Sequence, residues 1–213
     1  TSGIATNGST TITPSAYSFT QTAGFSVIKY TGNTTGGAKV AHGLGATPTL
    51  VMVKNLGGTD SWMVYQKHVK ATAPEDWLMQ INTTGAAVDN TMWNDTAPDD
   101  VNITLGTDNG VNGSYDYIAY CFAPIQGKQL FGRYYGNANV NGPYIQTNFR
   151  PKFVVLKRLD GTTGWPMFTN PPYTENDVPA PALWTDATTA EGAYTTIDFL
   201  SNGFKIRDSS AVI

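Results

Sequence analysis

Short runs of apolar or alternating residues, bounded by Gly, Pro, Asn and Asp, recur along the chain from Phe25 onward. Runs of this length with such boundaries predict β-strands. The first part of the chain contains candidate strands at residues 25–31, 39–42, 49–55, 62–66, 77–82, 101–105 and 115–122. The second part contains candidates at residues 130–135, 144–147, 152–157, 165–168, 195–199 and 203–207. A further pairing strand is expected near residues 17–20, so the pattern predicts an all-β protein.

One of these strand candidates occurs twice. PTLVMVKN at residues 48–55 returns as PKFVVLKR at residues 151–158, a spacing of 103 that Trp62 and Trp165 share. Three further pairs keep the same order along the chain: YTGN with YYGN, WND with WTD, and ITLGTDNGV with FKIRDSSAV. Five anchors in one order predict a duplicated unit of roughly 100 residues, the size of a small β-sandwich.

The predicted fold is an antiparallel, jelly-roll-like β-sandwich in two tandem units. Residues 1–24 are expected to be a lead-in or linker, residues 25–125 the first unit and residues 126–213 the second. The first unit ends with the aromatic-rich run YDYIAYCFA, and the second copy stops at Ile213, before the equivalent run. A sheet without its last strand leaves backbone donors and acceptors unpaired. We therefore expect either that the chain is a fragment of a longer polypeptide or that another chain supplies the strand.

The composition agrees with a β-protein and argues against several functional classes. Hydrophobic residues make up 40% of the chain and charged residues only 14%, with 22 Gly and 12 Pro. Thr, Asn and Ser must supply the surface polarity, and they favour strands and turns over helices. The net charge of −3, without a Lys/Arg cluster, gives no electrostatic footprint for nucleic acid. No apolar run approaches the ~20 residues of a membrane span, and the single Cys121 excludes an internal disulfide.

Three carboxylates lie close together in the segment WNDTAPDD: Asp95, Asp99 and Asp100. Glycoside hydrolysis needs two carboxyl groups about 5–10 Å apart on rigid elements, whereas these three lie in a turn-like sequence. Asp in such turns commonly bonds its own backbone. Oxygen-rich loops also suit calcium, so the alternative hypothesis is a Ca²⁺ site at these three residues.

The histidines and the cysteine are expected to serve the fold. His42, in AHGLG, is interpreted as a half-buried residue entering a Gly-rich turn, rather than as a general base or metal ligand. His68, in YQKHVK, is expected in a solvated loop. Cys121, in AYCFA, is expected to be a small buried apolar residue. The sequence contains no motif typical of a catalytic nucleophile or a phosphate-binding loop.

Aromatic residues are the better candidates for ligand contact. The tryptophans that recur in both copies are expected to pack in the core, because duplicated positions usually hold the fold. Trp77, Tyr135 and Tyr173 lack aromatic counterparts in the other copy. These three are the candidates for exposed stacking on sugar rings, as in carbohydrate-binding sandwiches.

The segments FSVIKYTGN, VAHGLGATPTLVMVKN, WNDTAP, YIAYCFA and NGPYIQTNFRPKFVVLKR carry a family resemblance. The chain from Phe25 onward resembles a module of uncharacterised function found in tail-fibre-like and other virion proteins of bacteriophages, many of them marine. Such modules often stand beside laminin-G/concanavalin-like domains and continue into a further strand after the equivalent of AVI. The lead-in resembles the connector between consecutive modules. The resemblance assigns no catalytic residues.

These observations favour a non-enzymatic phage structural protein, in a tail fibre, spike or capsid surface, with a display, attachment or assembly role. Its expected location is the virion, outside the cell, and its expected partners are other virion proteins and further copies of itself. The alternative is a carbohydrate-binding module that recognises host surface glycans. A polysaccharide depolymerase is disfavoured, because the sequence offers no credible carboxylate pair.

Overall fold

The computed structural model describes residues 3–170, 180–194 and 196–210, and within these ranges the protein is all-β. Its strands pair in antiparallel sheets, and its helical elements are three short 3-10 turns. The chain divides into two compact units. The first comprises the chain up to Gln80 together with Ala87–Ile125, and the second comprises Ile81–Ala86 together with the chain from Gln126. The prediction of an antiparallel β-sandwich fold is confirmed.

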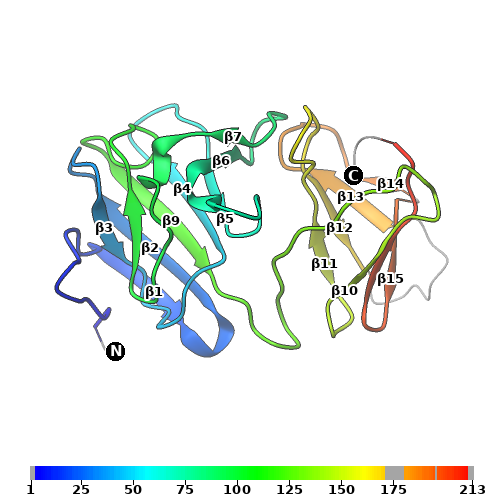
Figure 1. The fold of residues 1–213 in the computed structure, drawn as a ribbon, viewed down its shortest axis with the longest axis horizontal. Helices are drawn as coiled ribbons and strands as arrows, with labels where there is room; N and C mark the ends of the chain where they lie inside the picture. The colour runs from blue at the N-terminus through cyan, green and yellow to red at the C-terminus, as the bar shows by residue number, and fades with distance from the viewer. Residues whose placement is uncertain (1–2, 171–179, 195, 211–213) are drawn as a thin grey trace. The chain divides into compact units, whose positions relative to one another are not determined.

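The first unit contains a seven-stranded sheet in the order β1-β2-β9-β4-β5-β6-β7 and a two-stranded sheet of β3 and β8 (Figure 1). Its strands are β1 (Ala16–Thr20), β2 (Phe25–Thr31), β3 (Ala38–Ala41), β4 (Leu50–Asn55), β5 (Met63–Gln66), β6 (Trp77–Gln80), β7 (Val88–Asp89), β8 (Asn102–Leu105) and β9 (Asp116–Phe122). The strand β9, the last of the first unit in sequence, therefore lies in the middle of the sheet between β2 and β4.

Strict alternation of buried and half-buried residues along β2, β4 and β9 creates the core face of the large sheet. Successive side chains of a strand point to opposite faces, so every second residue is buried. Tyr30 and Tyr117 are both fully buried on this face, and their rings stack with centroids 5.2 Å apart. Val40 and Ile103, from the small sheet, belong to the same core cluster. The two sheets thus pack as a sandwich around one core.

The segment before Phe25 is part of the first unit. Ile12 is buried and forms an isolated bridge with Val40, and β1 pairs with β2 along its whole length. Thr10 also donates a hydrogen bond to the buried Asn102 at 2.7 Å. The expected lead-in at residues 1–24 therefore packs on the first sandwich where the structure describes it.

The second unit contains a four-stranded sheet, β11-β12-β13-β14, and a three-stranded sheet, β10-β16-β15. The strands are β10 (Tyr144–Gln146), β11 (Phe153–Val155), β12 (Pro166–Thr169), β13 (Ala180–Trp184), β14 (Gly192–Tyr194), β15 (Ile197–Leu200) and β16 (Gly203–Ile206). Val154 and Phe168 from the first of these sheets and Phe199 and Phe204 from the second are buried in one cluster. This unit has its own core.

The two units share one strand register at the spacing of the repeated sequence. Val51 of β4 lies opposite Tyr65 of β5. Val154 of β11 and Phe168 of β12, which follow these two residues by 103 positions, also lie opposite each other. The lysine that ends each copy also has the same role. The ammonium group of Lys54 donates a hydrogen bond to the main-chain oxygen of Asp60. The ammonium group of Lys157 donates one to the main-chain oxygen of Thr163 in the same way. These matches support the duplication, which remains a prediction from the sequence.

The strand predicted at residues 130–135 is wrong, because the structure describes this segment without a strand. Its counterpart in the first unit is β2, which pairs with β9 over seven residues. Three strands were not predicted: β7, which spans two residues, and β13 and β14, which lie in sequence rich in Pro, Ala and Gly. None of the helical turns in the described ranges is long and apolar enough to cross a membrane.

Candidate functional site

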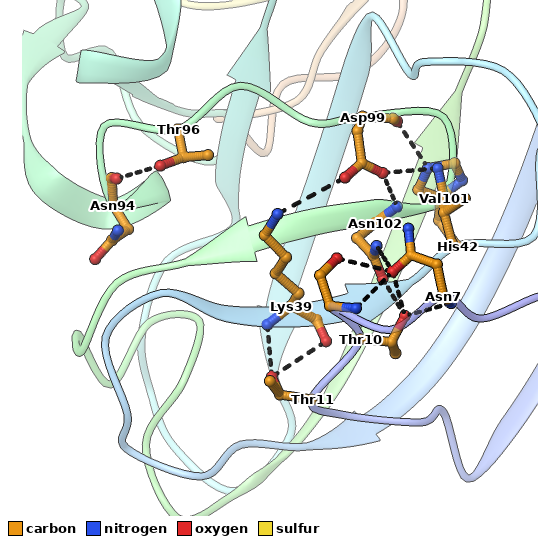
Figure 2. A network of polar contacts seen from close by, with 11 residues as sticks. Asn7, Thr10, Thr11, Lys39, His42, Asn94, Thr96, Asp99, Val101 and Asn102 are labelled. Carbon is orange, nitrogen blue, oxygen red and sulfur yellow. Dashed lines mark hydrogen bonds and ion pairs between the residues drawn. The ribbon is translucent and has the colours of Figure 1, made fainter.

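A network of polar contacts joins the lead-in to β3 and to the loop before β8 (Figure 2). His42, directly after β3, is fully buried and joins the network through Asp99. The N–H of Leu44 donates to Nδ1 of His42 at 3.2 Å, and Nε2 lies 3.2 Å from the main-chain oxygen of Asp99. Because Nδ1 accepts a hydrogen bond, the proton of the neutral ring is on Nε2, which donates to Asp99. Both ring nitrogens are therefore engaged, and His42 holds two loops together.

Burial lowers the pKa of His42 below its ordinary value of 6.5, although the main-chain oxygen of Asp99 and the charges of Asp99 and Asp100 act in the opposite direction. A histidine with a lowered pKa in the folded state binds protons more readily when unfolded. The contribution of His42 to the free energy of unfolding should therefore be fully present above pH 6.5. It should decrease as the pH is lowered from 6.5 toward the pKa of His42 in the folded state. The interpretation of His42 as a fold residue agrees with the structure, but its burial is complete.

We expect the urea concentration at the unfolding midpoint to decrease when the pH is lowered from 8 to 5. The decrease should be smaller in the His42→Gln variant. Glutamine cannot acquire the charge that destabilises the buried ring. His68→Gln is the control for the loss of a histidine at an exposed position. An equal pH dependence in His42→Gln and the unmodified chain would contradict the role of His42.

Asp99 uses its carboxylate to shape the turn into β8. Its Oδ1 accepts hydrogen bonds from the N–H groups of Val101 at 2.8 Å and Asn102 at 2.6 Å, and its Oδ2 lies 3.8 Å from Lys39 Nζ. Burial tends to raise the pKa of Asp99, but these two N–H groups and the charge of Lys39 outweigh it and lower the pKa. Asp99 is thus an ionised residue that stabilises a turn.

The structure gives no support to a calcium site at Asp95, Asp99 and Asp100. Among the residues that it describes, no group of three or more His, Cys, Asp or Glu side chains is placed to hold a metal ion. Asp95 follows Asn94 in the left-handed region, with φ of 44° and 52°, at the end of the 3-10 turn Thr91–Trp93. The positions of Asp95 and Asp99 fit the turn formation that the sequence analysis favoured, and the alternative of a calcium site stays a prediction.

The aromatic candidates lie in different surroundings. Trp77, in β6 of the first unit, is half-buried, and Lys70 Nζ lies 3.8 Å from its ring centroid. Tyr135, in the second unit, is 77% exposed, with the guanidinium of Arg133 5.2 Å from its ring centroid. Tyr173 lies outside the described residues. The aromatic prediction for sugar stacking stays a prediction, with Tyr135 the most exposed of the two described candidates.

A shallow surface hollow of about 490 Å³ lies at one end of β2 and β9. Its lining residues come from three chain segments: Lys29, Thr31, Leu56, Gly57, Ser114, Tyr115 and Asp116. Lys29 Nζ lies 2.7 Å from Asp116 Oδ2, and the hydroxyl of Thr31 donates to Asp116 Oδ1 at 2.7 Å. The hydrogen bond from Lys29, followed by that from Thr31, lowers the pKa of Asp116. An ionised carboxylate of this kind can accept hydrogen bonds from a ligand but is a poor general acid.

Sequence patterns could not reveal this hollow. Thr31 and Asp116 are 85 positions apart and become neighbours only because β2 pairs with β9. The rim carries two exposed apolar side chains, Leu56 at 52% and Tyr115 at 41%. An exposed tyrosine beside charged hydrogen-bonding groups is a combination that suits a polar ligand with one apolar face, such as a sugar ring.

Cys121 is fully buried in β9, and burial raises the pKa of its thiol to about 12. The thiolate is the reactive form, and this site provides neither the ionisation nor the access that reactivity requires. We expect no reaction with a thiol reagent such as DTNB in the native protein, and one equivalent after unfolding in urea. Rapid reaction without denaturant would contradict the buried position of β9.

Comparison with curated proteins and with solved structures found no significant match. One family model, by contrast, covers the sequence from its first residue to its last. The model matches residues 1–213, so it spans both sandwich units and the lead-in. The chain therefore belongs to the family described as a domain of unknown function, DUF7483.

Proposed function

We propose that the chain is a non-enzymatic structural module of a bacteriophage virion, in a tail fibre, spike or capsid surface. Its role there is display, attachment or assembly, and its partners are other virion proteins and further copies of itself. The proposal combines the family resemblance of the sequence with the surface of the second unit.

The observation that carries the assembly role is the apolar surface of the second unit. Among its described residues, seven large apolar side chains are more than a third exposed: Leu130, Tyr135, Val140, Tyr144, Phe153, Val155 and Leu183. Single exposed apolar residues are normal on a protein surface, but several of them within one small unit favour an interaction surface. A virion subunit, which is surrounded by other subunits, is the kind of protein in which such a surface is covered.

The chemically versatile residues of the first unit also support a structural role. His42 uses both ring nitrogens to fix loops, Asp99 uses one carboxylate oxygen to accept two backbone hydrogen bonds, and Cys121 is buried in the central strand. Each of these groups stabilises the fold from a position within it.

Proteomic analysis of purified phage particles tests the proposed location. Particles whose genome encodes this sequence should contain its peptides in stoichiometric amounts, and antibodies against the chain should label one structural feature in electron micrographs. Native mass spectrometry of the purified chain should show oligomers. Absence of the peptides from the particles would exclude the virion role, and a monomer at every concentration tested would exclude self-assembly.

The second candidate function is carbohydrate binding, and the hollow beside Tyr115 is the observation that favours it. A sugar ring stacked on Tyr115 could exchange hydrogen bonds with Asp116 and Lys29 at the floor of the hollow. Binding on a glycan array should be lost in Tyr115→Ala and kept in Tyr17→Ala, which removes an exposed tyrosine elsewhere on the unit. Equal binding by both variants would exclude the hollow, and a loss in Tyr135→Ala would place the sugar site on the second unit.

A further inference from the structure

The strand β11 forms the edge of its sheet, whereas its counterpart in the first unit lies inside one. Among the described strands, β11 pairs with β12 alone (Figure 1). The counterpart β4 pairs with β5 on one side and with β9 on the other. Because β4/β5 and β11/β12 share one register at a spacing of 103, the open edge of β11 corresponds to the position that β9 occupies beside β4.

The main-chain groups of Phe153 and Val155 face this open edge. Residues of an antiparallel strand direct their hydrogen bonds alternately to one neighbour and to the other. The oxygen of Lys152 accepts a hydrogen bond from Asn170 at 2.9 Å, and the N–H of Leu156 donates to the first residue of β12 at 3.1 Å. The main-chain N–H and C=O groups of the even-numbered residues of β11 therefore face β12. Those of Phe153 and Val155 point away from β12, toward the open edge.

The side chains at this edge lack the cover that the equivalent residues have in the first unit. Leu50 and Met52, on the outer face of β4, are half-buried beside the outward aromatic residues of β9. Their counterparts Phe153 and Val155 are 58% and 36% exposed. The inward residue Val154 is 8% exposed, so the core side of β11 is formed while its edge and outer side are open.

The segment at residues 130–135 points to the same missing neighbour. It aligns with β2, which pairs with β9 over seven residues, yet it is described without a strand. Tyr134, the counterpart of Tyr30, already packs against the core of the second unit. One additional strand beside β11 would occupy the position that β9 occupies beside β4.

We propose that the open edge of β11 is a strand-addition site that binds an extended polypeptide segment with the residue pattern of β9, from outside the 213 residues. The segment runs antiparallel to β11, as β9 runs antiparallel to β4. This mode of binding uses main-chain hydrogen bonds for affinity and alternate side chains for specificity. It does not depend on the proposed location in a virion.

The register of β9 defines the side chains that fit. Cys121 and Ala119 lie opposite Val51 and Val53 on the core face of the first unit. The segment that binds β11 therefore places small residues toward the core, opposite Val154 and Leu156. Aromatic or large apolar residues alternate with them and cover the exposed outer face of β11.

A synthetic peptide tests the site on the intact 213-residue chain. The peptide copies residues 115–123 as YDYIAYSFA, with Cys121→Ser to prevent oxidation. We expect saturable binding at one peptide per chain, and slower amide hydrogen exchange at Phe153, at Val155 and within residues 130–135. Val155→Pro removes the N–H that faces the open edge and keeps the hydrogen bonds to β12, so it should weaken binding at least tenfold. Val155→Thr, which keeps this N–H, is the matched control and should bind as the unmodified chain does.

A second peptide keeps the test independent of how well Val155→Pro folds. N-methylation at Ile118 and Tyr120, whose main-chain groups face β4 in the first unit, should abolish binding to the unmodified chain. No binding of the unmodified peptide, or protection confined to the first unit, would overturn the proposal. A peptide-independent dimer that Val155→Pro dissociates would also overturn it, because the occupant would then be β11 of a second copy.

Discussion

Replacement of Tyr30 by alanine should lower the free energy of unfolding of the first unit by about 3–5 kcal/mol, the range for large aromatic residues truncated in a core. Tyr30 is fully buried, its ring stacks on Tyr117, and its hydroxyl donates to the main-chain oxygen of Val111 at 2.7 Å. Alanine removes the packing, the ring contact and the hydrogen bond together. The urea dependence of Cys121 labelling measures the effect, because Cys121 lies in the same core.

Two further variants separate the contributions at Tyr30. Tyr30→Phe keeps the ring and leaves the oxygen of Val111 without its donor, so it should cost about 1–2 kcal/mol. Tyr17→Ala changes a tyrosine that is 38% exposed on the neighbouring strand β1, and should stay within about 1 kcal/mol of the unmodified chain. A loss below about 1 kcal/mol in Tyr30→Ala would show that the site is not tightly packed.

Replacement of Asn112 by alanine should lower the stability of the first unit by about 3 kcal/mol, since its side chain makes three hydrogen bonds that each contribute about 1 kcal/mol. Asn112 is fully buried, and its amide donates to the main-chain oxygens of Thr35 and Gly106, both at 2.8 Å. Its Oδ1 accepts from the N–H of Asn33 at 2.9 Å. One side chain thus joins the loop between β2 and β3 to the loop between β8 and β9, and each of these main-chain groups would lose its partner.

The aspartate variant tests the direction of these bonds. Asn112→Asp keeps the shape and the acceptor but aims a second oxygen at the carbonyls of Thr35 and Gly106. Burial raises the pKa of such a carboxyl, so the stability of this variant should fall further as the pH rises through that pKa. Asn109→Ala is the control in the same loop, because Asn109 is exposed and its main-chain oxygen is the acceptor for Tyr117. A control as damaging as Asn112→Ala would mean that the loop tolerates no change at all.

Periodicity in the sequence was sufficient to predict the strands whose pattern is set by burial. β2 was predicted with its observed bounds, and β4 and β9 within one residue at each end, because buried residues alternate along these strands. β8, which is buried at all four positions, was also predicted within one residue at each end. The segment at residues 130–135 has a similar pattern but no strand. A pattern of this kind therefore shows which residues suit a strand but does not by itself decide whether the strand forms.

The site features depended on contacts between distant parts of the chain, which composition and motifs do not encode. His42 was predicted as half-buried, but the main-chain oxygen of Asp99, 57 positions away, bonds to its ring and the residue is fully buried. The hollow beside Tyr115 forms through the pairing of β2 with β9. The role of Asp99 in the turn could be predicted from the sequence, because its carboxylate accepts hydrogen bonds from N–H groups only two and three residues later.

The central position of β9 has a consequence for the synthesis of this protein. The strands β2 and β4 leave the ribosome early, but the strand that joins them ends at Phe122. The large sheet therefore cannot close until more than half of the 213 residues have been translated, and both edges stay available for incorrect pairing until then. We expect the first unit to fold slowly for its size, since its main sheet depends on contacts between residues far apart in sequence. A chaperone that binds extended apolar strands would bind β2 and β4 during the time before β9 has been translated.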